Sequence, residues 1–317
     1  MSACATPVTV LSQWPQHVTS RIAELLGTSC RILQIAAGPI LTVDPDARIL
    51  LAAPDPSCST ESPTPAGWPG NIAWVQLISS GADLYPAWMV DHVSGPAVST
   101  GRGTSARPMA EFALAAIFAH AKSMPEVWIR DPSQWRYTSM RPVEGSRLGI
   151  AGYGTLGRAV AGLARSVGMS VMALKGRSGL QDAGGEVEYA GSLEELVASV
   201  DHLVLLLPGT ADTHHIVDDR LLTHAKPGLH LINLGRGTLV NQDALIRALD
   251  DGRLSRATLD VCDPEPLPQG HPLYSHLLVM LSPHTSVFSS ATFEALAQRV
   301  VRNFDAWRNG RALEGEV

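Results

Sequence analysis

The sequence lacks the features that mark several specialised classes of protein. No apolar run approaches the ~20 residues needed to cross a bilayer. The first residues show neither the basic start nor the unbroken apolar stretch of a signal peptide. The net charge is only -6 and is spread along the chain, which argues against a nucleic-acid or membrane-surface partner. No internal repeat or low-complexity tract is evident.

Cysteine is scarce and shows no pattern. Cys4, Cys30, Cys58 and Cys262 are scattered, without CxxC spacing or neighbouring metal ligands. Such residues are typical of reduced thiols in a cytosolic protein. We therefore expect a cytoplasmic protein that carries no structural metal.

What is present is an ordinary globular composition, with 45% hydrophobic and 17% charged residues. The 317 residues suffice for two domains at ~150 residues each. Strand-like segments alternate with helix-like segments, which predicts an α/β fold of two doubly wound parallel-sheet domains. The strands expected in the first domain are Val8–Leu11, Arg31–Ile35, Arg48–Ala52 and Ala73–Ile78, with a helix near residues 16–26 and a loop at Pro54–Gly70.

A glycine-rich turn, Gly152-Tyr153-Gly154-Thr155-Leu156-Gly157, is the most informative motif. An apolar strand candidate, 147–151, precedes it, and apolar residues at helical spacing follow it. In this context the first glycine permits a tight turn, the second admits a pyrophosphate, and the third lets helix and strand pack closely. The phosphates would lie at a helix N-terminus. The motif therefore predicts a dinucleotide-binding domain.

The βα alternation continues after this motif. Further strands are expected at Ser170–Leu174, His202–Leu207, His230–Leu234, Thr258–Val261 and Leu278–Ser282, and helices at Leu193–Ser199, Asp218–His224 and Gln242–Asp250. Asn241 is a plausible N-cap of the last helix.

An unusually apolar segment, Met109–Ser123, is predicted to be a buried helix, with Pro108 at its first position. Such a helix is more apolar than a surface helix requires. We expect a homodimer built on it and on adjacent segments that include Trp128 and Trp135. Burial within its own domain is the competing interpretation.

Three polar residues each follow a strand candidate of the second domain. Arg236 follows 230–234, Glu265 follows 258–261, and His284 follows 278–282. Because ligands of open α/β sheets bind outside the carboxyl ends of the strands, these three side chains are expected to converge on one crevice. A single such residue in a loop is more often solvated, but three on successive strand ends indicate a catalytic site.

With these motifs in their order and spacing, the sequence resembles the D-isomer-specific 2-hydroxyacid dehydrogenase family over nearly its whole length, and its glyoxylate/hydroxypyruvate reductases in particular. The likeness is strongest from Met109 to His284, whereas the N-terminal third matches weakly. The segments that carry it are Ala110-Glu111, the glycine motif, Lys226-Pro227-Gly228, Ile232–Gly237, Leu259–Val261, Glu265–Pro268, Pro283-His284 and, more weakly, Ser80–Asp83.

The resemblance implies an NAD(P)-dependent enzyme with a Rossmann-type cofactor domain and a flavodoxin-like substrate domain. Arg236 would bind the substrate carboxylate and keto oxygen, His284 would exchange a proton with that oxygen, and Glu265 would orient the imidazole. The backbone N–H groups of Ser80, Gly81 and Ala82 would receive the carboxylate. The cofactor-binding residues would be Gly152, Gly154, Thr155, Leu156, Gly157, Pro208 and Asp260. For Asp260, a structural role as a strand-end acid that caps a turn remains open.

The coenzyme preference is predicted from a position at which the sequence differs from the NAD-using members of the family. NAD-using relatives usually carry an acidic residue after the strand that follows the glycine helix. Here that strand, 170–174, is followed by Lys175, Arg177 and Ser178, and the first carboxylate is Asp182. Two cations and a hydroxyl suit the 2′-phosphate of NADP, so we expect NADP(H) to be preferred, with NAD possible. A solvated basic turn is the alternative.

NADPH use points to reduction of a small 2-oxo acid, for which glyoxylate and hydroxypyruvate are the expected substrates. Pocket-shaping residues would include Trp74 or Leu77, Trp135, and Ser286 or Phe288. The alternatives are a phosphite- or formate-type dehydrogenase on the same fold, or a non-catalytic dinucleotide-sensing protein. Glu265 argues against the formate enzymes, in which an amide replaces it.

The domains are expected to be discontinuous. Residues 100–285 would form the dinucleotide-binding domain, and residues 1–99 and 286–317 the substrate domain. The helix expected at 291–307 would then pack on the N-terminal domain.

Overall fold

The computed structural model of the chain describes residues 6–36, 38, 40, 43–54, 62–91, 95–124, 126–174 and 185–317. The chain forms two compact units. Unit 1 comprises Met1–Ser105 and Phe288–Val317, and unit 2 comprises Ala106–Val287. The divisions fall a few residues later than the boundaries expected from the sequence. No helix in the described ranges is long and apolar enough to cross a membrane.

Unit 2 contains a seven-stranded sheet with order β12-β11-β10-β9-β6-β7-β8, in which the pairings are parallel. The strands are β6 (Arg147–Ala151), β7 (Ser170–Leu174), β8 (Glu188–Ala190), β9 (His202–Leu205), β10 (Leu229–Asn233), β11 (Leu254–Leu259) and β12 (Val279–Leu281). The chain runs from β6 to one edge, then returns and continues from β9 to the other edge. The order therefore reverses between β6 and β9, the place where doubly wound sheets bind their ligands.

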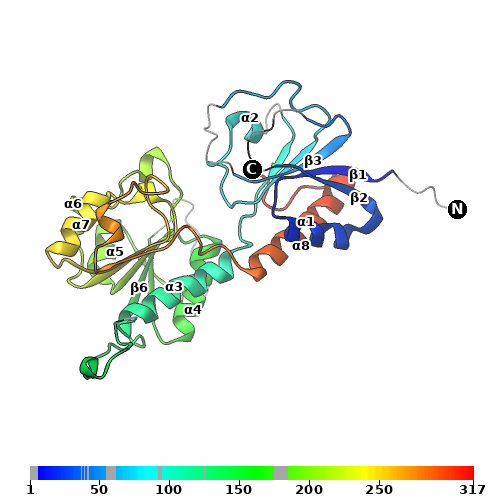
Figure 1. The fold of residues 1–317 in the computed structure, drawn as a ribbon. Coiled ribbons are helices and arrows are strands. Elements are labelled where there is room, and N and C mark those ends of the chain that lie inside the picture. Colours follow the sequence, from blue (N-terminus) through cyan, green and yellow to red (C-terminus); the bar gives the residue numbers. More distant parts are fainter. Residues whose placement is uncertain are drawn as a thin grey trace. The chain divides into compact units, whose positions relative to one another are not determined.

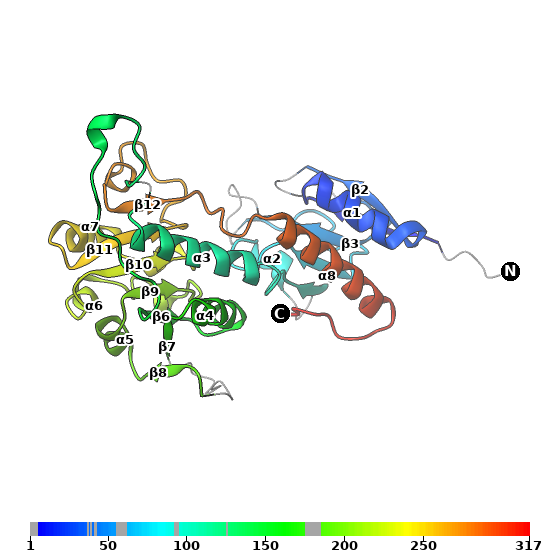
Figure 2. The same cartoon turned by 90° about the horizontal axis from the view of Figure 1, so that it is seen from below.

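Helices cover both faces of this sheet (Figure 2). α3 (Ala106–Ala121) and α4 (Thr155–Ser166) share one apolar core with the sheet, which includes Leu148 and Ile150 of β6. A second core holds α5 (Leu193–Ser199), α6 (Asp219–Leu222) and α7 (Gln242–Asp250) on the other face. Asn241 caps α7 as predicted, because its side chain accepts the Ala244 N–H at 2.9 Å.

Unit 1 contains a five-stranded parallel sheet with order β2-β1-β3-β4-β5. Its strands are β1 (Val8–Ser12), β2 (Cys30–Gln34), β3 (Ala47–Ala52), β4 (Trp74–Leu77) and β5 (Ala97–Ser99). α1 (Gln16–Leu26) and α8 (Ser290–Arg308) lie side by side and share a core with Trp14 and Trp74 (Figure 1). α2 (Ala87–Val90) contributes Met89 to a separate core with Tyr85. The C-terminal helix thus packs on the N-terminal sheet.

The predicted α/β fold of two doubly wound parallel sheets is confirmed. β5 and β8 were not anticipated, because strands of three residues show too little periodicity. Part of the expected loop at 54–70 lies outside the described residues.

The predicted bounds of the long apolar helix were wrong. It runs from Ala106 to Ala121, so Pro108 is its third residue and not its first. Proline is tolerated there because N–H groups of the first turn have no intrahelical partner. Seven of its residues are buried, Met109, Ala110, Ala113, Leu114, Ala116, Ile117 and Ala121, which accounts for its apolar character within its own unit.

Between α3 and β6 the chain forms a loop, residues 126–142, that projects from unit 2 in both views and that we call the arm (Figures 1 and 2). It contains one short 3₁₀ turn, η2 (Pro132–Gln134). Large apolar side chains are exposed along it: Trp128 (66%), Ile129 (42%), Trp135 (75%), Tyr137 (101%) and Met140 (47%). Such a concentration of exposed aromatic surface is typical of interaction sites.

Candidate active site

The glycine-rich turn joins β6 to α4. Gly152 has a φ of 111°, which glycine adopts without strain, and a Cβ there would lie 2.7 Å from the Leu206 backbone. A Cβ on Gly157 would lie 2.5 Å from the Gly152 carbonyl oxygen, so this glycine lets α4 pack on the turn. Gly154 is the N-cap of α4 and faces open space. The turn therefore fits a pyrophosphate, which needs close backbone approach and a helix N-terminus.

Three further predicted cofactor residues lie just beyond the carboxyl ends of β6 and β9. Thr155 and Leu156 form the first turn of α4. Pro208 follows β9, and its carbonyl accepts a hydrogen bond from the Thr213 hydroxyl at 2.6 Å. Because β6 and β9 are neighbours, these residues flank the switch point of the sheet.

Arg236 lies on the turn after β10, and Asn233 shapes that turn. The Asn233 Nδ2 donates to the Arg236 carbonyl at 2.8 Å, and its Oδ1 accepts from the Gly235 N–H at 3.1 Å. A Cβ on Gly237 would lie 2.0 Å from the Cys262 carbonyl, so glycine alone lets the turn approach the chain beyond β11. The sequence does not by itself indicate this role of Asn233. The signal was an asparagine two residues before a glycine, a pattern typical of side-chain-stabilised turns.

Glu265 and His284 form a hydrogen-bonded pair. The His284 Nδ1 lies 2.9 Å from the Glu265 Oε2, and the side chains are 34% and 38% exposed. The other carboxylate oxygen, Oε1, accepts the Cys262 N–H at 3.1 Å. The carboxylate is therefore held from two sides and engages Nδ1, which leaves Nε2 of the ring to exchange a proton with a substrate.

Asp260 holds the turn that carries His284. Its buried carboxylate accepts hydrogen bonds from the Ser282 hydroxyl at 2.6 Å and from the N–H groups of Thr285 and Ser286 at 2.9 and 3.0 Å. The His284 N–H donates to the Asp260 carbonyl at 2.8 Å. His284 itself has a φ of 50°, an uncommon conformation for a residue other than glycine. These contacts are those of a strand-end acid that caps a turn, and contact of Asp260 with a cofactor stays a prediction.

The surroundings of His284 favour its protonated form. The hydrogen bond to Glu265 raises the pKa of His284 above the ordinary value of 6.5; burial and the charge of Arg236 oppose this, while the Asp260 charge adds to it. The three polar residues expected to converge thus lie on the ends of neighbouring strands, with Glu265 and His284 in direct contact. A protonated imidazole beside a guanidinium suits an anionic substrate with a carbonyl oxygen.

The Ser80–Ala82 loop follows β4 in unit 1. The Ser79 hydroxyl donates to the Gly81 carbonyl at 2.6 Å, and the Gly101 N–H donates to the Ser79 carbonyl at 2.7 Å. These bonds hold the loop in a defined turn.

Two of the residues expected to shape the substrate pocket do not do so, and three of the expected coenzyme contacts cannot be described. Trp74 and Leu77 are fully buried in unit 1, at 0% exposure, and do not line a pocket. A central strand of a parallel sheet is covered on both faces, and the Trp74 indole N–H donates to the Ser99 hydroxyl at 2.8 Å. Lys175, Arg177 and Ser178 lie outside the described residues.

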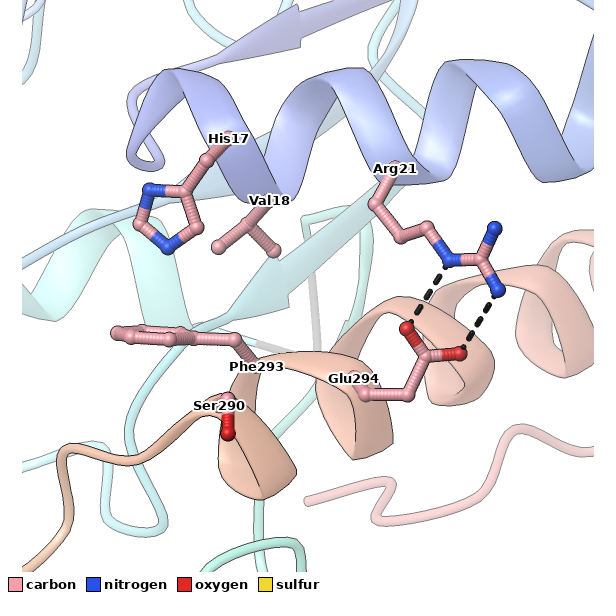
Figure 3. Close-up of a pocket in the computed structure, with 6 residues that line it drawn as sticks. All are labelled: His17, Val18, Arg21, Ser290, Phe293 and Glu294. Atoms are coloured by element: carbon pink, nitrogen blue, oxygen red, sulfur yellow. Dashed lines mark hydrogen bonds and ion pairs between the residues drawn. The ribbon is translucent and has the colours of Figure 1, made fainter.

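A pocket of about 380 Å³ lies between α1 and α8 of unit 1 (Figure 3). The rings of His17 and Phe293 pack edge to face, with their centroids 4.8 Å apart. Arg21 and Glu294 close another side with two hydrogen bonds of 3.0 and 3.1 Å. Its lining includes none of the predicted site residues.

Residues 114–286 match the family model for the D-isomer specific 2-hydroxyacid dehydrogenase, NAD binding domain. The glyoxylate/hydroxypyruvate reductase A of Serratia proteamaculans (strain 568) is 33% identical to the chain over 217 residues, which cover 67% of each protein.

Solved structures extend the similarity to the whole chain. A D-isomer specific 2-hydroxyacid dehydrogenase from Xanthobacter autotrophicus Py2, in complex with NADPH and MES, is 26% identical with a TM-score of 0.78, covering 99% of this chain and 98% of that one. An NADPH-dependent glyoxylate/hydroxypyruvate reductase from Sinorhizobium meliloti, in complex with NADP and malonate, is 25% identical with a TM-score of 0.79, covering 99% and 97%. The chain therefore belongs to the D-isomer specific 2-hydroxyacid dehydrogenase family and is an NAD(P)-dependent oxidoreductase.

Proposed function

We propose that this enzyme reduces a small 2-oxo acid with NADPH, and that glyoxylate and hydroxypyruvate are its substrates. The observation that carries the proposal is the 2.9 Å contact between the His284 Nδ1 and the Glu265 Oε2, with Arg236 close enough to influence the charge of the ring. This set combines an anion-binding fork with a proton donor. The Serratia and Sinorhizobium relatives, both named as glyoxylate/hydroxypyruvate reductases, support the substrate class.

Arg236 binds the substrate in this proposal. Its planar guanidinium can donate two parallel hydrogen bonds, and it would contact both the carboxylate and the adjacent keto oxygen. The fixed positive charge then stabilises the negative charge that develops on that oxygen. The backbone N–H groups of Ser80, Gly81 and Ala82 are proposed to receive the carboxylate as well, on the strength of the family resemblance.

His284 transfers the proton. When NADPH is bound, it supplies a hydride to the carbonyl carbon. His284 gives the proton at Nε2 to the carbonyl oxygen as the C=O π bond breaks, and the product is a 2-hydroxy acid. In the oxidative direction the neutral ring removes the hydroxyl proton. Glu265 keeps Nδ1 protonated and favours the imidazolium, so the ring holds the proton that it donates up to a higher pH than a free imidazole would.

The dinucleotide would be held by the glycine-rich turn, whose open space at Gly154 and constrained Gly152 and Gly157 fit a pyrophosphate. Thr155, Leu156 and Pro208 flank this site. Lys175, Arg177 and Ser178 are proposed to contact the 2′-phosphate of NADP, because two cations and a hydroxyl suit a dianion and no carboxylate there would repel it. The NADPH of the Xanthobacter structure and the NADP of the Sinorhizobium structure support this preference.

We also propose a homodimer. The apolar face of α3 is used within unit 2, so the contact is assigned to the arm, where Trp128 and Trp135 are 66% and 75% exposed. Aromatic side chains concentrated on a projecting loop are typical of a protein interface. Sedimentation should find a dimer at micromolar concentration that dissociates in a Trp128→Ser/Trp135→Ser variant; a stable monomer would refute the assignment.

The function is tested by following NADPH oxidation with a panel of 2-oxo acids that includes glyoxylate, hydroxypyruvate and pyruvate. The proposal expects turnover of at least one small 2-oxo acid, lost in Arg236→Ala. An Arg220→Ala variant, which changes an exposed arginine paired with Glu194, serves as the control and should keep full activity. Phosphite or formate oxidation with NADP⁺ in the absence of 2-oxo acid turnover would favour the other dehydrogenases of this fold. Dinucleotide binding without any turnover would indicate a sensor.

A further inference from the structure

Three histidines cluster at the amino end of the sheet in unit 2, opposite the end that carries His284. His202 begins β9, His230 is the second residue of β10, and His120 lies in the last turn of α3. Their ring centroids are 4.6 Å (120 to 230), 5.4 Å (202 to 230) and 5.9 Å (120 to 202) apart. The Nδ1 atoms of His202 and His230 are 3.2 Å apart, so one must carry a hydrogen and the other must accept it. This contact is incompatible with protonation of both rings.

The remaining polar contacts of the rings are with hydroxyl groups. The His230 Nε2 lies 2.9 Å from the Thr258 hydroxyl, and the His120 Nε2 lies 3.2 Å from the Ser255 hydroxyl. Among the residues that the structure describes, no carboxylate is hydrogen-bonded to any of the three rings, and no group of side chains could hold a metal ion. The cluster is therefore built from neutral imidazoles.

The charged groups around the cluster come from each element packed against it. Arg256 of β11 is buried and pairs with Glu126 of the arm at 2.8 Å. Arg141 of the arm acts on His120 and His202. Asp201, just before β9, is engaged by the Lys226 ammonium at 2.6 Å and by the backbone N–H of Arg147 at 2.8 Å. The carboxylates of Glu126 and Asp201 are thus paired with cations and not with the histidine rings. The positive charges of the two arginines act on these rings.

Burial and this surplus of positive charge disfavour the imidazolium. Burial, followed by Arg256 and Arg141, lowers the pKa of His120 to about 4, although Glu126 opposes this. Burial and the neighbouring ring of His120 lower the pKa of His202 to about 4, and that of His230 falls well below 6.5. Each ring is neutral in the folded unit and takes a proton when its surroundings open. Acid below pH 6.5 therefore favours an opened state.

The arm is the peripheral element attached to this cluster. Its base is closed by the Arg141 N–H, which donates to the Ala121 carbonyl at 2.9 Å, and by the Lys122 ammonium, which donates to the Arg141 carbonyl at 2.9 Å. Glu126 ties it to β11 through Arg256. β9 and β10, in contrast, are interior strands paired on both sides. Opening at the arm and the end of α3 leaves these strand pairings intact.

We propose that His120, His202 and His230 form an acid-sensitive anchor for the arm: below pH ~6, protonation of the cluster releases the last turn of α3 and residues 126–142 from the sheet while the rest of unit 2 stays folded. The arm and the surface it presents to a partner would thus respond to pH independently of the catalytic histidine.

Hydrogen–deuterium exchange of the full-length protein tests the anchor directly and without coenzyme or substrate. Exchange is followed at pH 7.5 and pH 5, and the rates are corrected for the intrinsic pH dependence of amide exchange. Because opening is favoured by up to about tenfold per pH unit for each ring that takes a proton, we expect protection of peptides from 118–142 to fall at least about tenfold at pH 5. Peptides of β9 and β10 should remain protected.

His120→Gln keeps a polar group beside Ser255 but does not titrate, so it should lose about tenfold less protection on acidification. His224→Gln, a change at an exposed histidine of unit 2, should behave like the parent protein. His202→Asn provides the same test if His120→Gln does not fold. The proposal is overturned if the arm stays protected at pH 5, if it opens only together with β9 and β10, or if His120→Gln and His202→Asn lose as much protection on acidification as the parent.

Discussion

The two ends of the seven-stranded sheet shift the pKa of histidine in opposite directions. At the carboxyl end, His284 lies one-third exposed against the Glu265 carboxylate, and its pKa is raised. At the amino end, His202 and His230 are buried against each other and near arginines, and their pKa values are lowered. The surroundings at the carboxyl end thus favour the protonated form of the ring, which a proton donor requires. The surroundings at the amino end favour neutral rings, which we propose take up protons in acid.

The backbone conformation of the histidines also differs between the two ends of the sheet. His284 adopts a φ of 50° and is held there by Asp260, whereas His202 and His230 lie in regular strands. Unusual conformations persist where surrounding contacts enforce them, and they concentrate at functional sites. The difference sets His284, the proposed proton donor, apart from histidines packed in a core.

The comparison predicts that the largest catalytic losses come from the carboxyl end. His284→Ala or Arg236→Ala should reduce kcat by about 10²–10⁴-fold, because a positioned acid and its partner charge are removed. NADPH binding, measured by fluorescence, should change little. His224→Ala at an exposed position is the matched control. A His284→Ala enzyme with near-parental turnover would show that the proton comes from elsewhere.

Coenzyme choice should depend on the basic residues that follow β7. If Lys175 and Arg177 each contribute about 1.5 kcal/mol to 2′-phosphate binding, NADPH is preferred by about a hundredfold in kcat/KM. Lys175→Asp combined with Arg177→Ser should collapse NADPH use and improve NADH use, and Arg220→Gln should alter neither. Equal kcat/KM for the two coenzymes in the parent enzyme would contradict the assignment.

The amino end should dominate the loss of stability in acid. A buried histidine whose pKa is about 4 when folded and about 6.5 when unfolded contributes stability above pH 6.5, and this is lost as the pH falls toward 4. Between pH 7 and pH 5 the loss is about 2 kcal/mol for one such ring. Urea unfolding at both pH values should show that His202→Asn removes this part of the pH dependence. An unchanged difference would mean that carboxylates dominate acid unfolding.

The fold was largely predictable from the sequence because its signals are local. Buried parallel strands are short apolar runs, and the glycine turn needs its three glycines for steric reasons visible in their spacing. The helix bounds near Pro108 were less accurate, because proline fits any position of a first turn.

The candidate site was predictable only in part. Arg236, Glu265 and His284 follow successive strands, so the topology places them on one edge. The anchoring role of Asp260 was not resolved, because it depends on which backbone N–H groups its carboxylate meets across 22 to 26 residues of sequence. The histidine cluster is not predictable from the sequence for the same reason, since His120, His202 and His230 meet through tertiary packing alone.

The smallest predicted effect tests the central claim most directly: that Glu265 keeps His284 protonated for reduction. The measurement is the pH profile of kcat/KM for NADPH-dependent glyoxylate reduction in the parent and in Glu265→Gln. Because the carboxylate raises the pKa of His284, its loss should move the alkaline limb to lower pH, by about one unit or less for a pair this exposed. Superimposable profiles, or a limb that moves to higher pH, would contradict the account.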